Sequence, residues 1–109
     1  MAGPSHKEEQ LQFLKGRFAE MGGAAFSPED GEAYMAHWTE FAGSEEGAAF
    51  LAELGLTEEE FLAENEAGID KAVKNWRREH ALWRRIQGLQ ADLGMDVEDF
   101  VPPGQYSYH

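Results

Sequence analysis

The chain has 109 residues, no cysteine, and 21 acidic residues against 9 basic ones, for a formal net charge of −12. This length suits one domain with a modest core. The absence of cysteine excludes a disulfide scaffold, a thiol nucleophile and thiolate metal sites. No apolar run approaches the ~20 residues of a membrane span, and the first residues lack the charged-then-apolar order of a signal peptide. We therefore expect a soluble, cytoplasmic protein that does not enter a membrane.

Serine and glycine residues mark the first helix boundaries. A serine oxygen at the N-cap accepts a hydrogen bond from a backbone N–H of the first turn, and glycine ends helices because it tolerates the left-handed conformation. The expected caps are Ser5, Ser27 and Ser44, and the expected stops are Gly22, Gly23 and Gly43.

A short pattern occurs twice, at residues 52–62 and 91–101. In each copy a glycine, Gly55 or Gly94, is expected to end a helix, and the next apolar residue to pack back in a Schellman turn. We interpret the likeness as convergent turn chemistry and not as a structural repeat. The polar residues expected to cap the following helices are Thr57 and Asp96.

Residues 58–93 carry no strong stop signal except Gly68. As one helix this segment would be ~54 Å long, whereas a compact chain of this length has a radius of gyration of only ~13 Å. A glycine inside a helix costs ~1 kcal/mol relative to alanine. We therefore predict a break at Gly68, with a short helix up to about Glu66 and a long one from Ile69 to Leu93.

The apolar spacing predicts an all-α fold, a single compact helical domain of four to six helices over residues 1–101, with a long C-terminal helix. Residues 102–109 are expected to form an extended aromatic tail that can dock on this domain. The third helix, residues 45–54, is expected to bury Phe50, Leu51 and Leu54. The main apolar stripe of the long helix is Ile69, Ala72, Val73, Trp76, His80 and Trp83.

Charge is unevenly distributed along the chain. Residues 1–70 carry a net charge of −13, residues 71–91 carry +5, and residues 92–109 carry −4. The basic face of the long helix is interpreted either as a solvated surface that pairs with the acidic body or as an anion-binding surface. Its members are Lys71, Lys74, Arg77, Arg78, Arg84 and Arg85.

No motif for catalysis or metal binding is present. The four histidines lack the spacing of a zinc or di-iron site, and every serine before the tail is explained as a cap. His37 shares a helix face with Glu40, but one histidine and one carboxylate make a weak ligand set. Glu79 lies near the apolar tryptophan surface, where a salt bridge to an arginine is expected. The sequence therefore implies no cofactor.

These observations favour a non-enzymatic interaction protein, namely a small acidic accessory subunit, adaptor or inhibitor that acts on a basic protein partner. Direct binding to nucleic acid is not expected at this net charge. The alternatives are a nucleic-acid mimic, a small enzyme or cofactor-binding subunit that uses His37 or His80, and a homodimer through the long helix. The candidate interaction residues are Trp76, His80, Trp83, Arg77, Arg78, Arg84, Arg85, Glu58, Glu59, Tyr106 and Tyr108.

Overall fold

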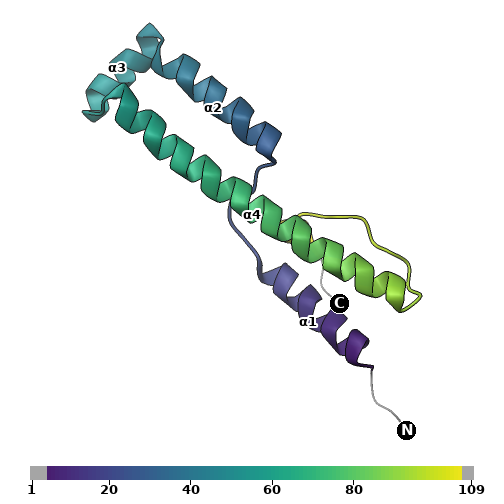
Figure 1. The fold of residues 1–109 in the computed structure, drawn as a ribbon. Coiled ribbons are helices and arrows are strands. Elements are labelled where there is room, and N and C mark those ends of the chain that lie inside the picture. Colours follow the sequence, from purple (N-terminus) through teal and green to yellow (C-terminus); the bar gives the residue numbers. More distant parts are fainter. Residues whose placement is uncertain (1–4, 107–109) are drawn as a thin grey trace. The chain divides into compact units, whose positions relative to one another are not determined.

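The computed structural model describes residues 5–106, drawn as a ribbon in Figure 1. The described residues contain four α-helices and one 3-10 helix, and no strand occurs among them. The elements are α1 (His6–Glu20), α2 (Pro28–Ala42), α3 (Glu45–Leu54), α4 (Glu58–Asp92) and η1 (Pro103–Gln105). The predicted all-α class with one long helix is confirmed.

The chain divides into two compact units. Unit 1 comprises Met1–Gly23 and Arg77–His109, of which residues 5–23 and 77–106 are described, and unit 2 is Ala24–Trp76. Each unit has a core cluster of its own. The expectation of a single compact domain is therefore not confirmed, and the two units are described separately.

Helix α4 contributes to both units and runs without a break from Glu58 to Asp92. The predicted break at Gly68 is wrong. A Cβ added at Gly68 would meet no atom within 4 Å, so this glycine serves no close contact and costs only helix propensity. A break would be needed only if α4 belonged to one globule, whereas its two parts belong to different compact units.

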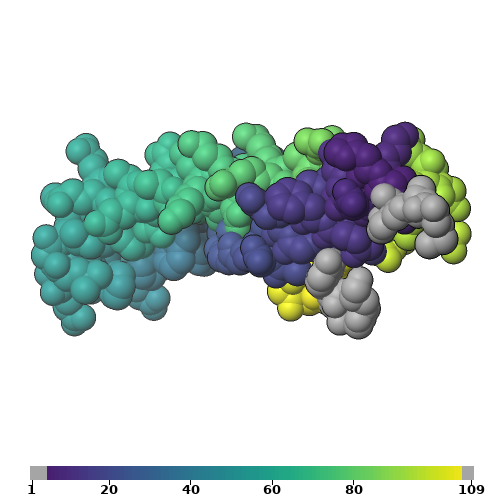
Figure 2. Space-filling model, turned by 90° about the horizontal axis from the view of Figure 1, so that it is seen from below, coloured from purple at the N-terminus to yellow at the C-terminus, as the bar shows by residue number. Residues whose placement is uncertain are grey.

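Unit 1 packs α1 antiparallel to the C-terminal part of α4. Lys7 near the start of α1 pairs with Asp92 at the end of α4, at 3.4 Å, whereas Phe18 near the end of α1 contacts Trp83, nine residues earlier on α4. In Figure 2, α1 is the purple segment lying against the green C-terminal part of α4. The buried residues of this core are Leu11, Phe18, Trp83 and Ile86.

The segment after α4 is not a helix but an extended strap. Residues 95–102 form no helix, so the predicted capping role of Asp96 is wrong. The reason is tertiary: side chains of α4 bind the backbone of Glu98 instead. The Gln90 Oε1 atom accepts from the Glu98 N–H at 3.1 Å, and the Trp83 Nε1–H and Gln87 Nε2–H groups donate to the Glu98 carbonyl at 3.1 and 2.9 Å. Gln90 is fully buried.

The described part of the tail docks on the same core. The Tyr106 ring lies 5.3 Å from both the Phe18 and the Trp83 rings, and Pro103 is buried. The expected extended conformation of residues 102–109 is not confirmed, because Pro103–Gln105 form the 3-10 helix η1. Tyr108 lies outside the described residues.

Unit 2 packs α2 antiparallel to the first part of α4, with α3 connecting them (Figure 1). The Phe26 N–H donates to the Ala72 carbonyl at 3.2 Å, which attaches the start of the unit to α4. A Cβ at Gly31 would lie 2.9 Å from Val73 Cγ2, so the α2 backbone rests directly on α4 side chains. At the other end of the unit, the Trp38 and Phe61 rings meet edge-on at 5.8 Å.

Helix α3 buries less than predicted. Leu51 is 4% exposed, but Phe50 and Leu54 are 42% and 54% exposed, so their predicted burial is wrong. The buried face of this short helix is centred on Gly47 and Leu51. Phe50 lies at its edge, where it contacts the rings of Phe41 and Phe61.

Most of the predicted caps are confirmed. The three serine oxygens accept from backbone N–H groups at 3.0–3.2 Å, and Gly55 and Gly94 both have φ of +70°. The Leu56 and Met95 N–H groups close the two Schellman turns at 3.0 and 2.9 Å. Helix α1 instead ends at an extended Met21, before the two glycines.

Candidate interaction surface

The two units differ strongly in charge. Unit 2 holds thirteen acidic residues and two basic ones, a net charge of −11, whereas unit 1 holds eight and seven, a net charge of −1. Nearly all of the chain's net negative charge, −11 of −12, is therefore concentrated in residues 24–76, which a division of the sequence at residue 70 does not reveal.

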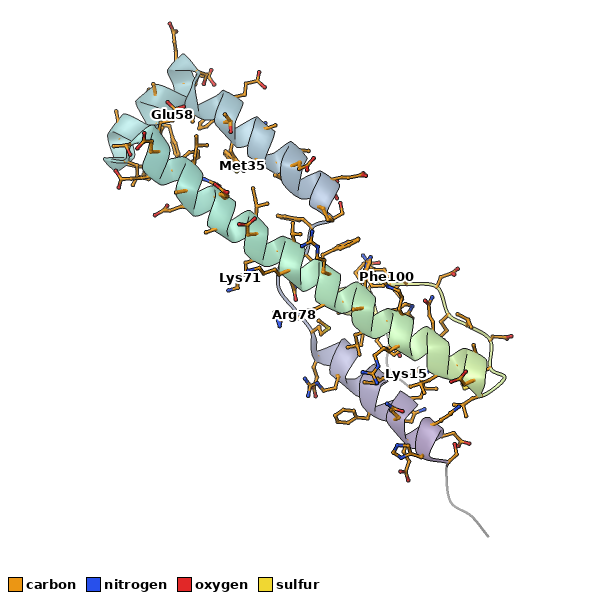
Figure 3. The ribbon with its side chains drawn as sticks, in the orientation of Figure 1. Lys15, Met35, Glu58, Lys71, Arg78 and Phe100 are labelled. Carbon is orange, nitrogen blue, oxygen red and sulfur yellow. The ribbon has the colours of Figure 1, made fainter. Side chains whose placement is uncertain are left out.

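All thirteen carboxylates of unit 2 are on exposed residues. The structure shows no ion pair within residues 24–76, and the two bases of the unit, Lys71 and Lys74, bind none of these acids. In Figure 3, Lys71 points away from α2. The negative field of unit 2 is thus left for solvent or a partner.

A groove of 330 Å³ lies between α2 and α4 in unit 2. Its floor is apolar and half-buried, and Figure 3 shows Met35 between the two helices. Three exposed carboxylates stand along it, Glu32 from α2 and Glu66 and Asp70 from α4. We call this the α2–α4 groove; its lining residues are Pro28, Gly31, Glu32, Met35, Glu66, Ile69, Asp70 and Val73.

A larger groove of 600 Å³ lies in unit 1. Its apolar lining comes from Leu11, Leu93 and the half-exposed Met95, and its acids are Glu8 and Glu9. Both acids belong to the first turn of α1, where carboxylates favourably face the positive end of the helix dipole. The helix dipole therefore explains the position of these charges without a ligand.

The candidate interaction residues predicted from the sequence differ in how exposed they are in the structure. Trp83 is 1% exposed and belongs to the unit 1 core, so its indole is not available to a partner. Trp76 and His80 are half-buried, and Glu58 and Glu59 are exposed in the first turn of α4. The four arginines are exposed, and no ion pair to another described residue is shown for them; they are Arg77, Arg78, Arg84 and Arg85.

The histidines do not converge on one site. His37 lies in unit 2 and lines a shallow hollow of 460 Å³ with Asp30 and Tyr34, all from α2. His80 lies in unit 1, where its ring packs 3.8 Å from that of Phe100. No group of three or more potential metal ligands occurs within residues 5–106.

Two neighbouring groups on α4 have shifted pKa values. Burial raises the pKa of Glu79 above its ordinary value, because desolvation disfavours the carboxylate. Burial lowers the pKa of His80, and the nearby Arg84 guanidinium lowers it further. Both shifts disfavour the charged form inside the fold.

We predict that His80 makes the protein less stable in acid. Above pH 6.5, the ordinary pKa, His80 is neutral in both states. Below it the unfolded chain takes up the proton first, so the free energy of unfolding falls as the pH falls. Urea unfolding of wild type and His80→Gln from about pH 8 to about pH 5 should show this loss in the wild type relative to the variant. If the difference in free energy of unfolding between the wild type and His80→Gln does not change with pH, the prediction is contradicted.

Sequence reasoning missed the carboxylates of the α2–α4 groove. The sequence does contain a signal for the side of the groove that α4 forms. Glu66 and Asp70 are four residues apart on this helix, as are Ile69 and Val73 on an adjacent face. The other side, Glu32 and Met35, needs the pairing of α2 with α4, which no local pattern gives.

No protein-family model matches the chain, and neither the curated proteins nor the solved structures give a match to it. None of the helices in residues 5–106 is both long enough and apolar enough to cross a bilayer.

Proposed function

We propose that this chain is a non-enzymatic interaction protein, an accessory subunit, adaptor or inhibitor of the cytoplasm that binds a basic protein partner. The observation that carries the proposal is the net charge of −11 on unit 2, exposed and without ion pairs among the described residues. Such a field speeds association with a cationic surface and selects against acidic partners.

Unit 1 supports the proposal in a different way. Its ion pairs, its buried tryptophan and its docked tail give it the contacts of a structural core, with a net charge of only −1. We assign it the role of holding one end of α4, while unit 2 presents the acidic surface.

The test is affinity capture with the full-length chain from an extract of its source cells. We expect a basic protein to be retained at low salt and released as the salt rises, because exposed charge pairs are screened within about 10 Å at 0.1 M. The purified partner should then bind with the same salt dependence. Competition by duplex DNA would identify the partner as a nucleic-acid-binding protein, the case of mimicry. Stoichiometric binding of a neutral or acidic partner, insensitive to salt, would contradict the proposal.

A further inference from the structure

Unit 2 combines an apolar floor with unpaired carboxylates in one place, the α2–α4 groove. We propose that this groove receives a lysine or arginine side chain of the partner together with an adjacent apolar residue. The inference rests on the proposed function and specifies where the basic partner binds.

The floor suits the aliphatic part of such a side chain. Met35, Ile69 and Val73 are half-buried and line a groove of 330 Å³, at the lower end of the volumes of ligand pockets. Lysine and arginine bury their methylene stems on apolar surface while the charged end reaches polar groups. A groove of this size fits side chains of a docked segment better than a large cofactor.

The carboxylates suit the charged end. Glu32, Glu66 and Asp70 come from both helices that form the groove, so an inserted cation has acids on either side. All three are exposed and take part in no ion pair among the described residues. A hydrogen-bonded pair between such a carboxylate and a lysine or arginine is stronger than a neutral hydrogen bond.

The larger unit 1 groove also has an apolar lining and two acids, but they do not flank it from two helices. Its acids, Glu8 and Glu9, come from the first turn of one helix, and its unit is almost neutral. The higher negative charge of unit 2 therefore favours the α2–α4 groove as the docking site.

The test measures binding of a synthetic helical peptide that carries leucine and arginine on one face, titrated into the full-length protein at low salt. One variant combines Glu32→Gln, Glu66→Gln and Asp70→Asn. A matched control combines Glu40→Gln, Glu53→Gln and Glu64→Gln, which removes the same charge from exposed positions of unit 2 outside the groove. Circular dichroism confirms that both variants keep their helices.

We expect the groove variant to weaken binding at least about tenfold, or ~1.4 kcal/mol, and the control about twofold or less. Met35→Gln, which makes the floor polar at nearly constant length, should weaken binding as well. Replacing either the leucines or the arginines of the peptide should also reduce affinity.

If the two triple variants lose the same amount of affinity for the peptide, the groove is not the docking site. The proposed function would still stand, because binding would then depend on the charge of unit 2 as a whole. Undiminished binding of the peptide without leucine would overturn the groove assignment too. If the wild-type chain does not bind the peptide, the groove assignment fails, and the capture experiment decides the proposed function independently.

Discussion

Gly47→Ala is expected to unfold unit 2 or to destabilise it by about 3 kcal/mol or more. A Cβ at this position would overlap the carbonyl oxygen of Phe41 and lie 2.7 Å from its carbonyl carbon. Both obstacles are backbone atoms, so no side-chain rotation relieves the clash. Helix α3 must move away from the end of α2, and the packing of Leu51 is lost with it.

The matched control is Gly68→Ala on α4, where an added Cβ meets nothing within 4 Å. This change should stabilise the helix by up to ~1 kcal/mol, because alanine is the better helix former. Urea unfolding gives the free-energy change, and amide hydrogen exchange in residues 45–54 locates it. A Gly47→Ala variant as stable as the wild type would show that α2 and α3 do not approach as described.

Trp83→Ala is expected to cost unit 1 about 3–5 kcal/mol. The side chain is 1% exposed, its ring lies 4.8 Å from Phe18 and 5.3 Å from Tyr106, and its N–H holds the Glu98 carbonyl at 3.1 Å. Truncation therefore opens a cavity and releases both the strap after α4 and the tail.

Phe13→Ala is the control for the loss of an aromatic ring. Phe13 lies on α1 one turn and a half from Phe18, but it is 61% exposed, so its truncation should change the free energy of unfolding by only a few tenths of a kcal/mol to ~1 kcal/mol. Urea unfolding distinguishes the two variants. If Phe13→Ala and Trp83→Ala lower the free energy of unfolding by similar amounts, the assignment of Trp83 to the core is contradicted.

Local chemistry explains which parts of the fold were predictable. Ser27 caps its helix through a backbone N–H three residues away, and Gly94 ends α4 through its own φ, so neither depends on distant contacts. Asp96 is also a residue type that is favoured at an N-cap. The segment after it is nevertheless held extended by hydrogen bonds between the side chains of Gln90 and Trp83 and the backbone of Glu98. Long-range contacts override local preference at that point.

The candidate site was only partly predictable for the same reason. The acidity of the chain and the exposure of Glu58 and Glu59 follow from composition and helix position. The α2–α4 groove depends on the register that places Gly31 beside Val73, and this register is set by packing across the unit. The division of charge between the units likewise becomes visible only when α4 is divided near Trp76.

The central claim, that unit 2 is the surface that meets a basic partner, is tested most directly by amide NMR of the labelled full-length chain during titration with the leucine–arginine peptide. We expect the chemical-shift changes to be concentrated in α2 and in the part of α4 before Trp76, and added salt to reverse them. Changes concentrated in α1 and in the residues after Arg77 would contradict the claim.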